Sequence, residues 1–410
     1  MSQIALGPFY LETDALQLVR DGVDLKLRPQ AFLALKTLLK RRNEYVPYEE
    51  LLREAWGGSI VSRHTVATTV AEVRRALAEY GSWLGYRPKL GYRLDVPRGD
   101  EMIRTGWHQW NRRTREGFEK ALDCFQRAAQ QDPSDARAFE GMSRSWLTLG
   151  FFGLRPPREA SEGFVEAHSH AVAFRGLTPE LRHDRGVALH VFDRKLAEAE
   201  AELLQSHQEN ATASACVHLT LFYTARGNFS RAAPFLEQAR TADPLFATLP
   251  ATETFFWLCQ GRFDAAVASG RHGVDLHPYQ PLGRSYYAQA LEFSGDIPEA
   301  LRQHRLASVV SPDILWLRAL EARCLACTGE IAEARGILQD LERLRATDYI
   351  DAYYLALLHG ALGNTDAAFD EFARAEKENS AALYMVQVDP KLNALRADPR
   401  LTALQRRLFV

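Results

Sequence analysis

The sequence predicts an α+β head over the first 98 residues and an all-α body of repeated helical hairpins behind it. Strand-like runs and three helical stretches fill the head, and from Gly227 to Gly363 a glycine recurs every 34 residues. Residues 1–98 contain 15 Lys and Arg against 11 Asp and Glu, whereas the other 312 residues contain 35 against 41. A basic head on an acidic body is typical of a nucleic-acid-binding domain joined to a part with another role.

The composition is that of a globular protein with more than one hydrophobic core. The chain has 410 residues, of which 46% are hydrophobic and 25% charged, too many for a single domain. No signal peptide opens the chain, and no apolar run approaches the roughly 20 residues that span a bilayer. The five cysteines are scattered, which favours a reduced, cytoplasmic protein without disulfides or a membrane partner.

The head begins with strands and continues with helices. Residues 1–27 contain short apolar or alternating runs, with Asp21-Gly22 as a hairpin turn signal. Pro29 begins a first helix and Pro47 a second, which a glycine pair ends. This order predicts a helix-turn-helix.

The third helix, Ser62 to Leu77, is the candidate recognition element. Val66, Val70, Val73 and Leu77 repeat at intervals of 4, 3 and 4 and form one apolar face. The opposite face is short and polar, which suits a DNA major groove, although an ordinary solvated surface helix is the alternative. Its predicted DNA contacts are Arg63, His64, Thr68, Thr69, Glu72, Arg74 and Arg75.

A basic hairpin is predicted after this helix, in the stretch WLGYRPKLGYRLDV. Aromatic and apolar residues alternate around Pro88-Lys89-Leu90-Gly91, as expected for two strands and a turn. Cationic side chains on such a hairpin contact phosphates and set the register on DNA. Its predicted DNA contacts are Arg87, Lys89, Tyr92 and Arg93.

The order of strands, two helices, recognition helix and hairpin resembles the OmpR/PhoB-type winged-helix domain. The matching strings are RDGVDLKLRPQAFLALKTLL, YEELLREAW, VSRHTV with VRRAL, and PKLGYRL, within residues 4–96. The resemblance implies DNA binding, with the Ser62 helix in the major groove and the wing in the adjacent minor groove. CadC-like members place a membrane helix after this domain, but VPRGDEM leads directly into helices here, so we expect no anchor. No receiver domain precedes the head, so we expect no aspartyl phosphorylation.

The sequence departs from the family pattern at three positions. Ala71 and Glu72 stand where the family often has arginines, and Leu90 replaces a common wing arginine or glycine. Glu72 has two interpretations. It accepts a hydrogen bond from cytosine N4 and reads a C·G pair, or it pairs with Arg75 or another neighbouring arginine.

The body carries a 34-residue repeat in several registers at once. The recurring glycines are Gly227, Gly261, Gly295, Gly329 and Gly363. The alanines five positions later are Ala232, Ala266, Ala300, Ala334 and Ala368, and the small residues seven positions earlier are Thr220, Thr254, Ala288, Ala322 and Ala356. Pro244, Pro278 and Pro312 share the period. Glycine permits the turn inside a hairpin, small residues permit close helices, and proline ends a unit, so this is a tetratricopeptide (TPR) repeat.

We therefore divide the chain into a winged-helix domain (1–97), a linker (98–102), a TPR solenoid of about eight repeats (103–382) and a C-terminal capping segment (383–410). The strings WNRRTREGFEKALDCFQRAAQQDP and VDPKLNALRADPRL resemble TPR regions that follow CadC-like heads in bacterial regulators. This resemblance implies a bacterial transcriptional regulator whose solenoid senses or recruits something.

A TPR superhelix has a concave groove lined by the first helix of each hairpin. By the family's repeat pattern, the predicted partner-groove residues are Ser285, Gln289, Glu292, Trp316, Arg323 and Tyr353. A protein or peptide ligand, self-association and a small molecule are the alternatives for this face. The same residues also stabilise the stack, and Trp316 in particular suits simple packing.

No enzyme, cofactor or metal site is predicted. Cys324 and Cys327 form a lone C-x-x-C without the second pair that zinc requires. The sequence contains no phosphate-binding glycine loop and no nucleophile elbow. The sequence thus predicts a sequence-specific regulator that binds double-stranded DNA and whose body binds a partner, senses a signal or forms a homo-oligomer. The alternative is a non-enzymatic interaction scaffold whose winged helix binds protein.

Overall fold

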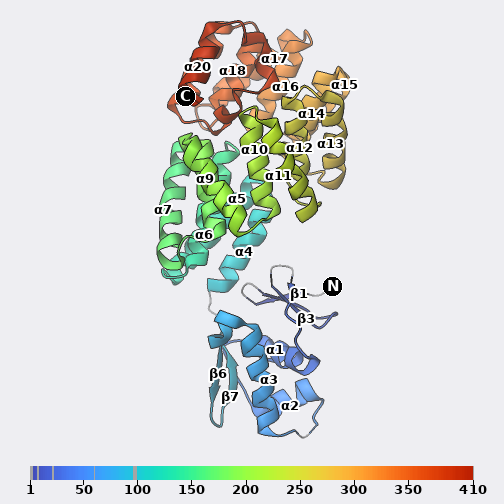
Figure 1. The fold of residues 1–410 in the computed structure, drawn as a ribbon, viewed down its shortest axis with the longest axis vertical. Coiled ribbons are helices and arrows are strands. Elements are labelled where there is room, and N and C mark those ends of the chain that lie inside the picture. The colour runs from blue at the N-terminus through green and yellow to red at the C-terminus, as the bar shows by residue number, and fades with distance from the viewer. Residues whose placement is uncertain (1–2, 7–8, 21–22, 60, 96–98, 410) are drawn as a thin grey trace. The chain divides into compact units, whose positions relative to one another are not determined.

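The computed structural model describes residues 3–6, 9–20, 23–59, 61–95 and 99–409 (Figure 1). These residues form two compact units, one of residues 1–108 with 127–133 and one of residues 109–126 with 134–410. The first contains both β-sheets and the second is helical, so the predicted fold class is confirmed. The turn predicted at Asp21-Gly22 lies outside the described residues.

The head begins with an antiparallel sheet of four strands in chain order. The strands are β1 (Gln3–Leu6), β2 (Phe9–Glu12), β3 (Gln17–Arg20) and β4 (Val23–Asp24). Leu11 faces Leu18 across the β2–β3 pair, and both are fully buried with Phe9. The alternation seen in the sequence therefore places one face of this sheet on the core.

Three helices follow, at the boundaries that the turn residues predict. They are α1 (Pro29–Lys40), α2 (Tyr48–Trp56) and α3 (Arg63–Ala76). Pro29 occupies the first turn of α1, and Gly57 ends α2 in the left-handed conformation at φ 62°. Helix α1 packs against both α2 and α3, so the supporting pair holds α3 with its outer face free.

The second sheet of the head has three strands in the order β5-β7-β6. Strands β6 (Leu84–Arg87) and β7 (Gly91–Leu94) form the predicted hairpin, and the 3-10 helix η1 (Ala78–Trp83) connects it to α3. The third strand, β5 (Tyr45–Val46), pairs with β7 and was not predicted. A strand of two residues is too short for periodicity to reveal it.

The body consists of helices that pack as successive hairpins. The helices after residue 98 are α4 (Gly99–Asn111), α5 (Arg115–Gln131), α6 (Ala136–Phe151), α7 (Pro157–Arg175), α8 (Pro179–Ala188), the π-helical turn η2 (Leu189–Asp193), α9 (Leu196–Glu209), α10 (Ala213–Ala225), α11 (Phe229–Ala242), α12 (Leu249–Cys259), α13 (Phe263–Leu276), α14 (Pro281–Ser294), α15 (Ile297–Val310), α16 (Leu315–Cys327), α17 (Ile331–Leu344), α18 (Ala352–Ala361) and α19 (Thr365–Lys377). From α6 to α19 each even-numbered helix packs against the helix that follows it. The predicted linker 98–102 is helical from Gly99, since Asp100 and Glu101 suit the first turn of α4.

The residues that recur every 34 positions lie in the turns and helix contacts that their types favour. The five recurring glycines adopt φ between 68° and 93° in the turns inside the hairpins. Residues that carry a Cβ adopt this backbone conformation only with strain. The five recurring alanines and the small residues before the glycines are all fully buried. The predicted TPR geometry, with close helices and left-handed turns, is therefore confirmed.

The chain ends in a segment that does more than cap the last repeat. It contains the 3-10 helices η3 (Ala381–Met385) and η4 (Pro390–Leu395) and the amphipathic helix α20 (Pro399–Phe409). Leu401, Leu404 and Leu408 are buried, as the capping prediction requires. Residues 380–395, the inner segment, reach back along the solenoid: the Tyr384 ring lies 5.3 Å from His190 and 6.5 Å from Phe255.

Candidate nucleic-acid interface

Helix α3 is fixed at its start by a side-chain cap. Ser62 accepts a hydrogen bond from the Thr65 N–H at 3.1 Å, which satisfies one of the free donors of the first turn. Val66, Val70 and Val73 are buried on the inner face, as the spacing predicts. The opposite face is consequently held in place without making core contacts of its own.

The outer face of α3 is short, polar and basic. Its exposed residues are Arg63, His64, Thr65, Ala67, Thr68, Arg74 and Arg75. Five of these were predicted as DNA contacts, whereas Thr65 and Ala67 were missed although their positions on the same helical turns would have revealed them. Small side chains beside Arg63 and His64 let the helix approach base edges closely.

One predicted contact on α3, Thr69, is not on this face. Thr69 is 4% exposed, and its hydroxyl donates to the Thr65 carbonyl at 2.9 Å. The position follows Val66 by three and precedes Val73 by four, so it belongs to the buried face. The prediction that Thr69 contacts DNA is therefore wrong.

Glu72 is held by the start of α1. Its carboxylate accepts hydrogen bonds from the Arg28 backbone N–H at 2.9 Å and from Arg28 Nε at 2.6 Å, and forms an ion pair with the same guanidinium. The side-chain hydrogen bond from Arg28 lowers the pKa of Glu72, so the carboxylate stays charged. Glu72 is thus paired with an arginine, as one of the two interpretations expected, but the partner is the distant Arg28 and not Arg75 or another arginine close in the sequence. The carboxylate is engaged in this clamp and is 18% exposed, so it is not free for direct readout of a C·G pair.

Arg74 connects the recognition helix to the hairpin. Its guanidinium Nη2 donates to the Leu84 carbonyl, the first residue of β6, at 2.7 Å. Although the residue is exposed, this bond holds part of its charge beside the hairpin. Arg74 thus positions the two elements relative to each other inside the head.

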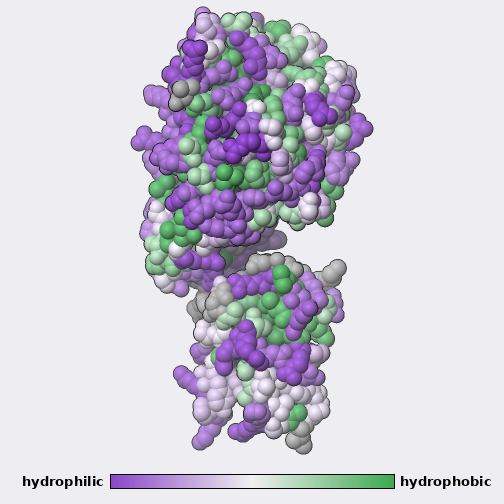
Figure 2. Space-filling view, viewed as in Figure 1, coloured by the Kyte–Doolittle hydropathy of each residue, from purple (hydrophilic) through white to green (hydrophobic). Residues whose placement is uncertain are grey.

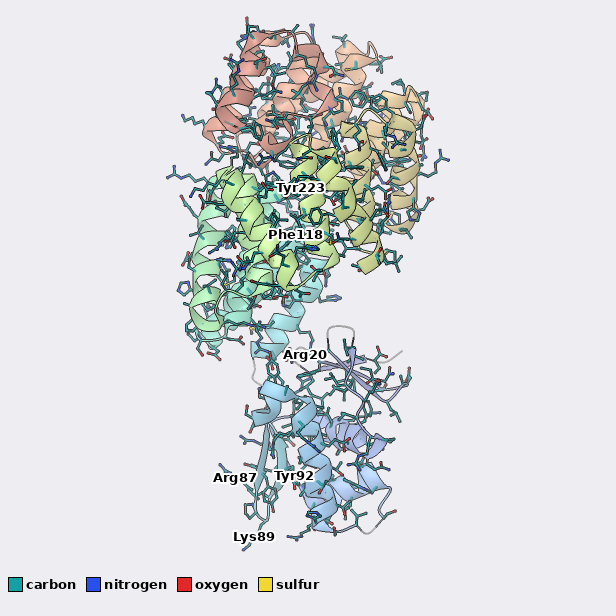
Figure 3. All side chains as sticks on the ribbon, viewed as in Figure 1. Arg20, Arg87, Lys89, Tyr92, Phe118 and Tyr223 are labelled. Carbon is teal, nitrogen blue, oxygen red and sulfur yellow. The ribbon has the colours of Figure 1, made fainter. Side chains whose placement is uncertain are left out.

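The hairpin tip presents two cations to solvent. Arg87 and Lys89 are exposed at the turn between β6 and β7, and Figure 3 places them at the free end of the hairpin. Lys89 takes φ 69° and Gly91 takes φ 101°. A Cβ on Gly91 would lie 2.0 Å from the Val46 carbonyl oxygen, so glycine is required for the hairpin to meet β5.

The other predicted wing contacts are partly engaged within the head. Arg93 forms an ion pair with Asp95 at 2.5 Å, and its guanidinium lies 5.0 Å from the centre of the Tyr45 ring. Tyr92 is half-buried with its ring 4.9 Å from that of Tyr86. Tyr86 is itself 52% exposed and was not predicted. In Figure 2 hydrophilic side chains project from the end of the head that carries this hairpin.

The predicted partner groove is closed. All six of its residues are inaccessible: Ser285 and Tyr353 are fully buried, Trp316, Arg323 and Gln289 are at most 4% exposed, and the Glu292 side chain is 8% exposed. The inner segment covers two of them, since Lys391 Nζ donates to Gln289 at 2.6 Å and the Tyr353 hydroxyl donates to Asp389 at 2.6 Å. The expectation of an exposed ligand face at these residues is therefore wrong.

The remaining groove residues also serve the interior. Trp316 donates from Nε1 to the Phe152 carbonyl at 2.8 Å and stacks on Tyr354, so the packing interpretation is correct. Arg323 forms a buried ion pair with Glu292. The repeat register contains no information on which other segment of the chain covers these residues.

Comparison with known proteins identifies the head and the fold of the body. Residues 22–94 match the family described as "Transcriptional regulatory protein, C terminal". The transcriptional activator CadC of Escherichia coli (strain K12) is 28% identical over 98 residues, which are 23% of this chain and 19% of CadC. The chain therefore matches about a fifth of the length of that relative.

Among solved structures, a human IFIT1 dimer with m7Gppp-AAAA is 14% identical and has a TM-score of 0.52, covering 77% of this chain and 78% of its own. A monomeric IFIT1 mutant with Gppp-AAAA has a TM-score of 0.53, covering 80% and 84%. At this identity the likeness concerns the fold alone.

The head is a winged-helix domain of the kind found in transcriptional regulatory proteins. A TPR-like solenoid follows it in the chain. Among the described residues, no helix is long and apolar enough to cross a membrane.

Proposed function

We propose that this chain is a sequence-specific transcriptional regulator that binds double-stranded DNA through its winged-helix head. One observation carries the proposal: the outer face of α3 and the tip of the β6–β7 hairpin are both exposed and basic within a single compact domain. In this arrangement α3 enters the major groove and the hairpin reaches the adjacent minor groove. We propose the bacterial cytoplasm as the location of this activity, because that is where its DNA target lies.

The two elements contribute different parts of the affinity. Arg87 and Lys89 at the tip neutralise phosphates, which supplies binding that is independent of sequence and sensitive to salt. His64, Thr65 and Thr68 present hydrogen-bonding groups beside small side chains, which suits contact with base edges. Because the positive charge of Arg28 offsets the negative charge of Glu72, this carboxylate repels the phosphate backbone less than an unpaired one would.

The solenoid is proposed to act by protein interaction and not by catalysis. Its inner residues are occupied by the chain's own residues 380–395, so a partner or a second copy binds its outer surface. Light scattering of the purified full-length chain distinguishes these two options. A dimer supports self-association as the way in which two heads are brought to one operator, and a monomer removes it.

The DNA-binding proposal is tested by measuring fluorescence anisotropy on a pool of random duplexes at increasing salt. Binding should weaken steeply, with about 0.9 counterions released for each phosphate that the protein neutralises. Selection from the same pool should then yield a defined motif. Failure to bind duplex at low salt would instead support the scaffold in which the winged helix binds protein.

A further inference from the structure

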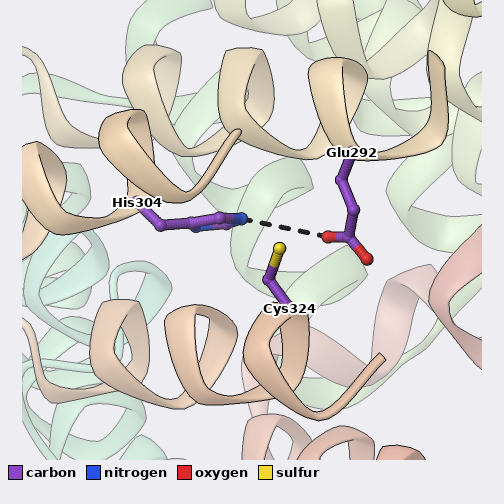
Figure 4. A group of neighbouring side chains, drawn as sticks. All are labelled: Glu292, His304 and Cys324. Atoms are coloured by element: carbon purple, nitrogen blue, oxygen red, sulfur yellow. Dashed lines mark ion pairs between the residues drawn. The ribbon is translucent and has the colours of Figure 1, made fainter. Parts of the chain in front are cut away.

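Three possible metal ligands from three consecutive helices meet inside the solenoid (Figure 4). They are Glu292 at the end of α14, His304 in α15 and Cys324 in α16, and one ligand atom of each lies within 4.8 Å of the other two. His304 is 1% exposed, Cys324 is fully buried and the Glu292 side chain is 8% exposed. His304 and Cys324 are thus buried, and Glu292 keeps partial access to solvent.

The imidazole in this cluster has an unusual environment. Neither ring nitrogen of His304 has a hydrogen-bond partner in the part of the chain that the structure describes. The nearest acceptor for Nε2 is the Glu292 carboxylate, at 3.9 Å, which is beyond hydrogen-bond distance. Buried polar atoms are rarely left unpaired, and each such case calls for an explanation. A bound cation would satisfy this nitrogen directly.

The three side chains together favour some metal ions over others. A thiolate, an imidazole and a carboxylate form the mixed ligand set that Zn²⁺ accepts, whereas Mg²⁺ and Ca²⁺ prefer oxygen alone. Zinc ligands lie about 2.0–2.3 Å from the ion and hence roughly 3.3–3.8 Å from one another in a tetrahedron. The observed separation within 4.8 Å therefore requires side-chain adjustments of about an ångström and no movement of a helix.

We propose that Glu292, His304 and Cys324 bind a divalent cation of the zinc class, which locks helices α14, α15 and α16 together. Water completes the tetrahedron at the fourth position. The site goes beyond the proposed DNA binding, because it lies in the solenoid and depends on none of the head residues. It also revises the sequence-based expectation of no metal site: Cys324 belongs to a lone C-x-x-C, and its fellow ligands Glu292 and His304 lie in the preceding hairpin, so no local spacing joins the three.

Proton balance at the site is straightforward. A cysteine binds a metal as its thiolate, so the Cys324 thiol gives up its proton on binding. Binding forms a metal–thiolate bond and releases that one proton to solvent. Binding should therefore strengthen as the pH rises.

Arg323 is compatible with this arrangement. It pairs with the Glu292 carboxylate, and its Nη1 also lies 3.6 Å from Cys327 Sγ. The ion pair with Arg323 keeps the Glu292 carboxylate charged, the form in which it coordinates a metal. Arg323 and His304 both approach the same Glu292 oxygen, Oε2, so a bound ion shares this oxygen with Arg323 or takes Oε1 after the carboxylate rotates.

The test uses the full-length chain, stripped of metal by a chelator and titrated with Co²⁺. The expected result is a thiolate-to-cobalt charge-transfer band together with tetrahedral visible bands, which Zn²⁺ abolishes and Mg²⁺ does not. Zn²⁺ should also raise the melting temperature of the solenoid. Absence of the charge-transfer band, or a zinc-independent melting temperature, overturns the proposal without reference to any variant.

Matched variants then assign the ligands. Cys324→Ser should remove the charge-transfer band, and His304→Asn should lower the cobalt affinity by more than about tenfold. Cys327→Ser is the control, because this cysteine is one helical turn away and exposed, and it should leave the spectrum unchanged. Circular dichroism establishes that each variant is folded. A band that survives in Cys324→Ser but is lost in Cys327→Ser overturns the assignment.

Discussion

Arg28 holds Glu72 from across the head, donating from its backbone N–H at 2.9 Å and from Nε at 2.6 Å. The two residues are 44 positions apart, at the start of α1 and in the middle of α3. The contact fixes the rotation of the recognition helix about its axis. It also occupies the only carboxylate that α3 carries, so the face toward solvent is basic.

Glu72→Ala should destabilise the head without changing which DNA sequence it prefers. The substitution releases Arg28 and leaves its hydrogen-bonding groups to water, so the melting temperature of the head should fall modestly. Selection from random duplexes should return the same motif for the variant and the parent. Glu54→Ala is the control, since Glu54 contacts only the adjacent Arg53 among the ion pairs observed. A changed preference at one base position in Glu72→Ala would contradict this prediction and support direct readout of a base by Glu72.

Lys89→Glu should weaken binding to all duplexes alike. Lys89 lies at the hairpin tip, where its charge meets phosphate and not base edges. Loss of one phosphate contact should reduce the slope of log affinity against log salt by about 0.9, as measured by anisotropy. Arg158→Glu reverses an exposed charge on α7 and should change nothing. An unaffected slope in Lys89→Glu would place the hairpin away from the phosphates.

Trp316→Ala should destabilise the solenoid. The indole is 4% exposed, stacks on Tyr354 and donates to Phe152, and truncation of such a side chain costs about 3–5 kcal/mol. Urea unfolding followed by circular dichroism measures the change. Trp316→Phe keeps a single aromatic ring but loses the hydrogen bond and some packing, so a smaller loss than for alanine is expected, on the order of 1–3 kcal/mol. An unchanged unfolding midpoint in Trp316→Ala would mean that this residue is free to contact a ligand.

Acid should unfold the solenoid partly through His190. Burial lowers the pKa of His190 to about 3, whereas an unfolded histidine titrates near 6.5. The unfolded state therefore takes up the proton first, and stability is lost as the pH falls from about 6.5 toward 3. At pH 5 this amounts to about 2 kcal/mol for one histidine.

His190→Phe tests this contribution, because a phenyl ring can keep the contacts with Phe222 and Tyr384. The difference in unfolding midpoint between pH 7.5 and pH 5 should shrink in the variant. His272→Gln, at an exposed position on α13, should behave like the parent. Equal pH dependence in all three proteins would show that His190 does not govern acid sensitivity.

Local chemistry made much of this fold predictable. Gly227 and its equivalents mark turns that only glycine adopts easily, and Ser62 marks the start of α3 because its hydroxyl caps the free N–H groups. Such features depend on neighbours within one or two helical turns. The apolar spacing of α3 likewise predicted its buried face, and closer attention to that spacing would have placed Thr69 on it.

Features that depend on distant residues escaped prediction. Gln289 and Lys391 are 102 positions apart, and nothing in the 34-residue period says that the chain end returns to the middle repeats. The same holds for Glu72 and Arg28, whose pairing follows from how α1 packs on α3. The exposure of the candidate DNA contacts on α3 was predicted well, because it follows from helical periodicity alone.

The return of residues 380–395 has a consequence for how this body can evolve. An open stack of repeats contacts only its neighbours, so it gains or loses a unit at little cost. Here Asp389 and Lys391 must meet Tyr353 on α18 and Gln289 on α14 at the same time. Deleting or duplicating one 34-residue unit between these helices would carry one partner out of reach. These contacts therefore fix the number of repeats between α14 and α18. Length variation should be confined to loops such as the one between α6 and α7.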